Sequence, residues 1–493
     1  MFGIMFIFIL LIVLLVSENT RHMADRLFWL DEVTTFLTVI KPFWEIPKDA
    51  AISSGQMQPP LFYWFGYLAV KIGTDPLTLR SISLAFYVIM IGFVIFALRE
   101  LQFASRIILC FVLIMSPFGA YAATEFRPYS LAALFILISS VLLYRTINEP
   151  SRWLSAILYG LAALALQYSL TLNCFVFGLH MVFLSVNIIY FCVKEGFRQT
   201  LNKYKPIIII SALLCIEYAP FLNIIWQVGN RSPAAPFHLS NYIKNLWSFK
   251  IVLINDIMLI RSWTVSIAIL CFLLGCTIGL LRNRWISAYL ILLFGGQFLF
   301  STLITFTRFN WLMQRYLVAS YVAFALLCAI GANYLFKSIN RKSTVFLLIS
   351  ILGTTLPASI YNFAVSLKTP KLNPAIEAID ALRCNNQPTI VLGEPSWISR
   401  VPMYAYRNDP LLIVPDEESD PNAIITHAAP NNICFILIEL PTHRRYEGKA
   451  YKSLSALPGY TQNKYSLKPG NNIAEYAWLF TPKGAKIKIN KDN

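Results

Sequence analysis

Long apolar segments separated by short polar ones make up most of the chain. About eleven of them approach the roughly 20 apolar residues that a helix needs to cross a bilayer. The segments cover residues 2–18, 79–98, 107–123, 129–146, 154–171, 173–193, 206–226, 263–281, 286–306, 317–336 and 343–363. The pattern predicts a polytopic α-helical membrane protein with about 11 transmembrane helices.

A long loop, residues 19–78, separates the first two predicted spans. Apolar residues repeat there at helical spacing: Trp29, Val33, Phe36, Leu37 and Ile40. Polar residues fall on the opposite face: Asp31, Thr34, Thr38 and Lys41. This predicts an amphipathic helix in the membrane interface, with Asp31 facing water. The pair Pro59-Pro60 ends any incoming helix, and the aromatic stretch after it, to Lys71, predicts a second interfacial helix.

After the last predicted span, residues 364–493 have a different character. Helical spacing covers 373–383, and short apolar runs follow at 389–392, 411–414 and 433–438, each bounded by turn-forming residues. Alternating helix and strand signals predict a small α/β domain. The expected organisation is therefore a transmembrane domain, residues 1–363, followed by a C-terminal domain, residues 364–493.

Composition agrees with a membrane protein, and charge orients it. The chain is 57% hydrophobic and 13% charged, with a mean hydropathy of +0.59. Its net charge of +16 comes largely from short loops between the spans, which argues against a nucleic-acid partner. Short basic loops are typical of the cytoplasmic side. We therefore expect a multi-pass membrane protein with loop 19–78, the 125–129 turn and the C-terminal domain facing the periplasm or an equivalent exterior.

Two of the nine cysteines, Cys384 and Cys434, lie in the polar C-terminal part, and the others lie in apolar segments. The two can pair if that part is exported, but the sequence does not decide the pairing. Walker, dinucleotide-binding and zinc-ligand spacings are missing from the sequence.

Two polar clusters stand out beside the membrane. Asp31 and Glu32 are costly to desolvate there, so chemistry or a cation is expected to hold them. Glu125, Arg127 and Tyr129 lie between two later spans. If both clusters are on one side, they can converge on a single site. Glu125 then either pairs with Arg127 or shares a divalent metal ion with the acidic pair, because clustered carboxylates suit hard cations.

Three short motifs in this order resemble the membrane-embedded GT-C glycosyltransferases of the protein O-mannosyltransferase and lipid A aminoarabinose transferase type. The motifs are Asp31-Glu32, Gln58-Pro59-Pro60-Leu61 and Glu125-Phe126-Arg127-Pro128-Tyr129. The resemblance implies a GT-C fold. It also implies inverting transfer of a sugar from a polyprenyl (undecaprenyl) phosphate carrier, on the periplasmic face. The acceptor would be an envelope component: lipid A or lipopolysaccharide, another glycan, or protein.

The resemblance also assigns roles. It makes Asp31 the catalytic base, with Glu32 beside it. Arg127 and Arg315 are candidates to bind the donor phosphate, since guanidinium groups bind phosphate oxygens bidentately. Gln58 stands where relatives often carry Lys or His, and an amide can hydrogen-bond a phosphate without neutralising it. Glu125 and Tyr129 would support these groups.

Other membrane functions fit parts of the pattern. A transporter or lipid flippase usually places ionisable groups near mid-membrane, and Glu217 is the one acidic residue well inside a predicted span. An O-antigen polymerase or ligase would carry its large functional loop later in the chain. Because the strong polar clusters are interfacial, the sequence favours the transferase.

Overall fold

The computed structural model describes two compact units, residues 1–23 with 38–369 and residues 24–37 with 370–493. The described residues are 28, 30–53, 58–115, 117–231, 262–282, 284–307, 317–338, 379, 382, 384, 388–394, 409–415, 420–429, 433–439, 449–466 and 476–482. The predicted spans 2–18 and 343–363, together with Trp29 and Arg315, lie outside these residues.

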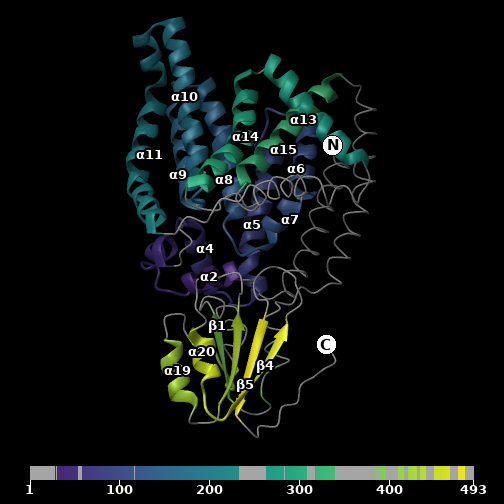
Figure 1. Cartoon of the computed structure of the whole chain (residues 1–493). Helices are drawn as coiled ribbons and strands as arrows, with labels where there is room; N and C mark the ends of the chain where they lie inside the picture. The colour runs from purple at the N-terminus through teal and green to yellow at the C-terminus, as the bar shows by residue number, and fades with distance from the viewer. Residues whose placement is uncertain are drawn as a thin grey trace. The chain divides into compact units, whose positions relative to one another are not determined.

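Long helices build the first unit (Figure 1). They are α5 (Pro76–Phe96), α6 (Phe103–Met115), α7 (Pro117–Thr124), α8 (Tyr129–Asn148), α9 (Trp153–Ser169), α10 (Asn173–Glu195), α11 (Phe197–Arg231), α13 (Ser262–Arg282), α14 (Arg284–Thr307) and α15 (Val318–Ser338). Each predicted span between residues 79 and 336 falls on one or two of them. Within the described residues, five helices are long and apolar enough to cross a membrane. The predicted polytopic helical fold is confirmed.

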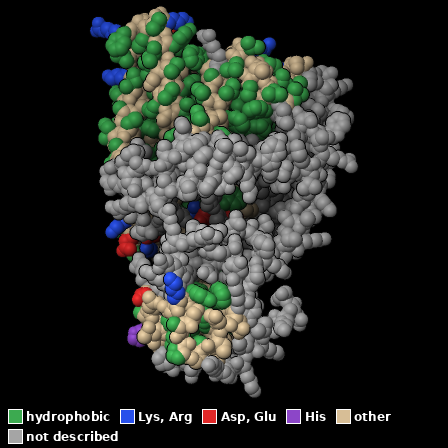
Figure 2. Space-filling view, in the orientation of Figure 1, with side chains coloured by type: hydrophobic (Ala, Val, Ile, Leu, Met, Phe, Trp, Pro, Cys, Tyr) green, Lys and Arg blue, Asp and Glu red, His purple; other side chains and the backbone are tan. Residues whose placement is uncertain are grey.

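The lipid-facing character of the bundle is visible on α10 and α11. Figure 2 shows hydrophobic side chains across their outer faces and Lys and Arg side chains at one end. Val182, Val186, Ile189 and Val193 recur along α10 at helical spacing and are all exposed. An exposed apolar stripe of this kind suits contact with lipid tails. Helices α8, α10, α13 and α15 all end on the same side of the bundle, and we call this side 'the basic end'.

Arginines at the basic end satisfy the carbonyls that the last turn of α5 leaves open. Arg106 Nη1 donates to the carbonyl of Ile95 at 2.5 Å. Arg145 Nη2 donates to that of Ala97 at 2.6 Å. Cations near a helix C-terminus also interact favourably with the helix dipole. These basic residues therefore help to hold the bundle together.

The predicted span at residues 107–123 is wrong as a single helix, because it divides into α6 and α7. Pro117 has no N–H, so it cannot bond the carbonyl of Leu113 four residues earlier. The hydroxyl of Tyr321 donates to this carbonyl at 2.6 Å, and that of Tyr87 donates to it as well. Gly119 lies against the same oxygen, where a Cβ would come within 2.1 Å. The break redirects the chain toward the 125–129 turn.

Helices α13 and α15 touch through their backbones. A Cβ on Gly275 would lie 2.0 Å from the carbonyl oxygen of Leu327, and one on Gly331 would lie 1.8 Å from that of Cys271. Only residues without a side chain allow this approach.

A buried polar network joins four other helices. The hydroxyl of Tyr289 on α14 lies 2.7 Å from Ser140 Oγ on α8 and 2.8 Å from His180 Nε2 on α10. The other ring nitrogen of His180 lies 3.3 Å from the hydroxyl of Tyr159 on α9. The network satisfies each of these buried groups, as apolar surroundings require.

The second unit contains a five-stranded sheet of order β2-β1-β3-β5-β4. Its strands are β1 (Thr389–Glu394), β2 (Leu412–Ile413), β3 (Cys434–Glu439), β4 (Tyr460–Ser466) and β5 (Tyr476–Pro482), with helices α19 (Pro421–Ala428) and α20 (Lys449–Ser455). The first three strands are parallel to one another, and β5 is antiparallel to β3 and β4. The runs at 389–392, 411–414 and 433–438 are strands, as predicted. Strands β4 and β5 were not predicted.

Alternate residues of the central strands form the core of this sheet. The core contains Ile390, Leu392, Phe435 and Leu437, with Ile425 of α19 and Leu454 of α20. Val391 and Ile436, on the other face, are also fully buried. A strand buried on both faces reads as a continuous apolar run, which explains why β3 was recognisable.

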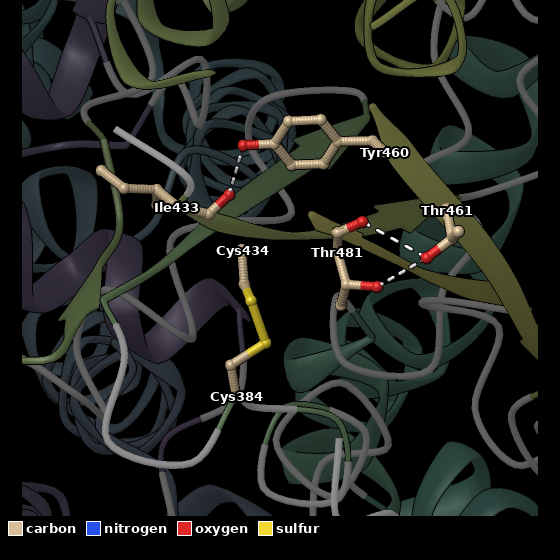
Figure 3. Close-up of a disulfide and its surroundings, with 6 residues drawn as sticks. All are labelled: Cys384, Ile433, Cys434, Tyr460, Thr461 and Thr481. Atoms are coloured by element: carbon tan, nitrogen blue, oxygen red, sulfur yellow. Dashed lines mark hydrogen bonds between the residues drawn. A yellow bond between two sulfur atoms is a disulfide. The ribbon is translucent and has the colours of Figure 1, made fainter. Parts of the chain in front are cut away.

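A disulfide joins Cys384 to Cys434 at the start of β3, and it closes a sequence separation of 50 residues (Figure 3). Nearby, the hydroxyl of Tyr460 donates to the carbonyl of Ile433 at 2.9 Å. Burial raises the pKa of this tyrosine. The hydroxyls of Thr461 and Thr481 lie 2.8 Å apart between β4 and β5. The structure thereby pairs the two cysteines whose pairing the sequence left open.

Replacing both Tyr87 and Tyr321 by Phe should destabilise the bundle far more than either change alone. Each single variant leaves one hydroxyl on the Leu113 carbonyl, whereas the double variant leaves a buried acceptor unsatisfied, at about 1–3 kcal/mol. Thermal unfolding of the purified protein in detergent measures the effect, with the exposed Tyr190→Phe as the control. Additive, small losses would contradict the shared-carbonyl role.

Opening the disulfide should loosen the C-terminal unit. The Cys384→Ser/Cys434→Ser variant is expected to lose about 2–4 kcal/mol, because the cross-link restricts the unfolded chain. Limited proteolysis of this unit reports the loss, and Cys215→Ser, which removes an exposed free thiol on α11, serves as the control. If a maleimide reagent labels Cys384 and Cys434 without prior reduction, the bond is not formed.

Candidate active site

The acidic pair lies in the first turn of α2 (Leu30–Val39). Negative charges at this position interact favourably with the dipole of the helix. The helix itself was predicted, but the prediction that its polar face is exposed to water was wrong. Thr34 and Thr38, on the predicted polar face, are 4% and 1% exposed. Asp31 is half-buried and Glu32 is completely buried. Thr38 tolerates burial because its hydroxyl donates to the carboxylate of Asp49 at 2.8 Å. The buried Thr35 donates in the same way to the Asp31 carbonyl at 2.9 Å.

The end of α2 is tied to the rest of the loop through Asp49. This carboxylate lies in a short π-helix, η1 (Asp49–Ser53), which follows α3 (Ile46–Lys48). It accepts a hydrogen bond from Thr38 at 2.8 Å and forms an ion pair with Lys41 at 2.5 Å. Both contacts fix the part of the loop that precedes Gln58. Sequence analysis did not single out Asp49.

Gln58 is held between this loop and the bundle. Its backbone N–H donates to Ala50 at 3.0 Å. Its side-chain oxygen lies 3.5 Å from the backbone nitrogen and 3.4 Å from the hydroxyl of Thr171, in the connection between α9 and α10. These weak contacts occupy the oxygen, so the amide NH₂ is the part suited to a phosphate. As predicted, the double proline is followed by a helix, α4 (Leu61–Val70), with Pro60 as its N-cap.

The second polar cluster is the turn between α7 and α8. The backbone N–H of Arg127 donates to the carbonyl of Glu125 at 2.7 Å, which closes the turn. Glu125 and Arg127 are 1% and 2% exposed, and Tyr129 is fully buried. The Arg127 guanidinium lies 5.9 Å from the centre of the Tyr129 ring. An arginine that only met lipid headgroups would be exposed, so its burial argues for a specific role.

Helix α4 and the end of α2 pack against this turn. The rings of Phe62 on α4 and Phe126 in the turn are 5.5 Å apart. A Cβ on Gly66 would lie 2.8 Å from Val39, at the end of α2, and 3.0 Å from Phe126. The structure therefore brings α4 and the end of α2 to the Glu125–Tyr129 turn, within one unit.

Arg80, near the start of α5, is a second buried arginine at the same end of the bundle. It is 1% exposed. Ser83, one turn further along α5, donates to the Arg127 carbonyl at 3.3 Å. Residues three apart share a helix face, so Arg80 lies on the side of α5 that faces the turn. Sequence analysis missed it because it looked like a charge at the edge of a span; the signal available was a single Arg inside the apolar segment 76–96.

The predicted site residues fall into three groups. Gln58, Glu125, Arg127 and Tyr129 lie in the first unit, around the packed loop and turn described above. Asp31 and Glu32 belong to the second unit. Their convergence with Arg127 stays a prediction, as does the role of Arg315. Among the described residues, no group of three or more His, Cys, Asp or Glu is placed to hold a metal ion.

Comparison with solved structures bears on the fold. ArnT from Cupriavidus metallidurans bound to undecaprenyl phosphate aligns with 98% of this chain and 99% of its own, with a TM-score of 0.55 and 11% identity. Its apo state aligns with 97% of both chains, with a TM-score of 0.53 and 11% identity. The oligosaccharyltransferase AglB from Archaeoglobus fulgidus, in complex with an inhibitory peptide and a dolichol-phosphate, aligns with 88% of this chain and 67% of its own. The TM-score of this alignment is 0.42 and the identity is 11%.

The predicted GT-C fold is therefore confirmed, over nearly the whole length of the chain. No protein-family model matches the sequence, and no curated protein matches it. At 11% identity the likeness concerns architecture, so the chemistry must be argued from the residues of this chain.

Proposed function

We propose that this protein is a multi-pass membrane glycosyltransferase that uses a polyprenyl-phosphate-linked sugar as its donor. The observation that carries the proposal is the shared fold, along 98% of this chain, with ArnT bound to undecaprenyl phosphate. The buried polar residues at the end of the bundle where α5 and α8 begin support it. A carrier of this kind is apolar along its length and anionic at one point, so it needs cations beside lipid-facing helices.

Arg127 and Arg80 are proposed to supply this positive charge. Both are almost completely buried, and a charge excluded from water acts strongly on a nearby anion. A guanidinium stays charged and offers paired donors to phosphate oxygens. The NH₂ of Gln58 and the side chain of Arg315 are proposed as further phosphate ligands, with Glu125 and Tyr129 orienting Arg127.

Asp31 is proposed as the catalytic base. A hydroxyl or amine of the acceptor attacks the anomeric carbon, the bond from that carbon to the phosphate oxygen breaks, and polyprenyl phosphate leaves with the electron pair. Attack opposite the leaving group inverts the anomeric centre. The acceptor's proton passes to Asp31, a step typically worth about 10²–10⁴-fold. Asp31 is the accessible member of the acidic pair, so Glu32 is assigned a supporting role.

The disulfide in the C-terminal unit supports an extracytoplasmic location for that unit, since such bonds persist in oxidising compartments. We infer that the sugar is transferred on the periplasmic face of a bacterial inner membrane. The acceptor class we propose is an envelope component: lipid A or lipopolysaccharide, another glycan, or protein.

The position of Glu217 does not favour a transporter. Its carboxylate accepts a 2.5 Å hydrogen bond from Tyr168. Tyr168 is the second-last residue of α9, which ends at Ser169. Glu217 therefore lies level with the end of a span and not at its middle, where transporters usually place ionisable groups.

Asp31→Asn should abolish sugar transfer while leaving the protein folded. The substitution keeps the size and polarity of the side chain and removes its basicity, so we expect a loss of about 10²-fold or more. Mass spectrometry of envelope lipids, glycans and proteins should show the same missing modification in cells with this variant as in cells lacking the protein.

Glu32→Gln tests the supporting role of Glu32, and Glu45→Gln in the same loop is its matched control. Glu32 is buried, so its loss should lower thermal stability as well as transfer, whereas Glu45 is exposed and should have no effect. Normal modification with Asp31→Asn would remove Asp31 as the base. An envelope unchanged by loss of the whole protein would overturn the proposed function itself.

Arg127→Ala and Arg80→Ala should each weaken binding of undecaprenyl phosphate by about tenfold or more, since a hydrogen bond to a charged group contributes about 1.5–3 kcal/mol. Lys at either position should recover part of the affinity, because it restores the charge without the bidentate geometry. Binding is measured with radiolabelled undecaprenyl phosphate in detergent, and exposed Arg99→Ala is the control. Unchanged affinity in folded Arg→Lys and Arg→Ala variants would contradict the assignment.

A further inference from the structure

A cavity lies at the basic end of the bundle, away from the proposed donor site. Its volume is about 330 Å³, within the usual range for small-molecule sites. The last turns of α8, α13 and α15, the start of α14 and the loop after α5 surround it. Tyr144 in its wall is 15 residues along α8 from Tyr129, which places the two about 22 Å apart along the helix.

The mouth of this cavity is cationic. Arg282 and Lys337 line it, and both side chains are exposed. The Arg282 guanidinium lies 5.8 Å from the centre of the Tyr334 ring, which holds it at the cavity edge. Hydroxyl groups of Tyr144 and Tyr334 add hydrogen-bonding capacity there.

One acidic residue, Glu100, also lines the cavity, but its charge is already compensated. Arg145 donates to both of its carboxylate oxygens, at 2.5 Å and 3.0 Å. Burial opposes ionisation of Glu100, but the hydrogen bonds from Arg145 and the backbone, together with the charges of Arg145 and Arg106, outweigh it and hold the pKa of Glu100 below its usual value. The charge that remains toward the cavity is therefore positive.

The inner wall is mostly apolar, and its two buried polar residues, Ser140 and Asn333, are hydrogen-bonded within the protein. Leu98, Val141, Leu290 and Leu326 line it and are buried, and Ile286 and Ile330 are half-buried beside them. A cationic mouth over an apolar wall fits a molecule with an anionic head and a hydrocarbon chain. A free anion would leave the apolar wall exposed to water, which is unfavourable.

We propose that this cavity binds an anionic phospholipid of the leaflet at the basic end. Its phosphate would contact Arg282 and Lys337, with Tyr144 and Tyr334 beside it, and part of an acyl chain would cover the apolar wall. Basic pockets between transmembrane helices are suited to anionic lipid headgroups. Because the lipid would contact α8, α13, α14 and α15 together, it would stabilise their packing. The proposal does not depend on the proposed glycosyltransferase activity.

The test uses the full-length protein in a neutral detergent. Phosphatidylglycerol or phosphatidylcholine is added in mixed micelles, and the thermal midpoint and the lipid adducts in native mass spectra are recorded. Phosphatidylglycerol should raise the midpoint and remain bound, and phosphatidylcholine should do so about tenfold less effectively. Inorganic phosphate at the same concentration should have no effect. Equal stabilisation by inorganic phosphate would mean a free-anion site and overturn the proposal.

Variants locate the effect. Arg282→Ala/Lys337→Ala should lower affinity for phosphatidylglycerol about tenfold or more and remove the preference for it. Ile286→Trp, which narrows the cavity and leaves its charges, should weaken retention of both lipids. Lys194→Ala/Arg198→Ala removes two cations at the same end but outside the cavity, and should change nothing. An equal loss of preference in that control would show non-specific attraction and overturn the site, as would equal binding of the two lipids by the unaltered protein.

Discussion

The carbonyl of Leu113 is the point on which the arrangement of the candidate site depends. Pro117 cannot donate to it, so the apolar segment 107–123 cannot continue as one helix. Two tyrosines from distant helices, α5 and α15, take over the missing hydrogen bond. The chain then changes direction into α7, and the next turn enters the protein interior.

Burial of charge distinguishes this region from the basic end of the bundle. Glu125, Arg127 and Arg80 are at most 2% exposed. Removing such groups from water is costly unless other charges and hydrogen bonds compensate them. At the basic end, most arginines and lysines are exposed or cap helix carbonyls. The buried groups therefore have the character of a functional site, and the exposed ones that of an orienting surface.

The sequence predicted the elements that are marked by long apolar runs. It did not predict which polar side chains are buried, because tertiary packing decides that. Long apolar runs located the helices, and the buried central strand β3 was recognisable for the same reason. The two-faced pattern of α2 suggested an exposed polar side, but small hydroxyl groups such as Thr38 can be buried once a partner such as Asp49 accepts their hydrogen bond. Strand β4 is largely polar, so its run lacked a strand signal. Arg80 became notable only when its complete burial was visible.

The backbone contact between α13 and α15 has a consequence for tracing distant relatives. At Gly275 and Gly331 even a methyl group would collide with a carbonyl of the facing helix. Any homologue that keeps this crossing must keep glycine at both places, however far the remaining positions drift. When only 11% of residues agree, two such invariant points, 56 residues apart in the numbering of this chain, give an alignment a fixed register that hydropathy alone cannot provide.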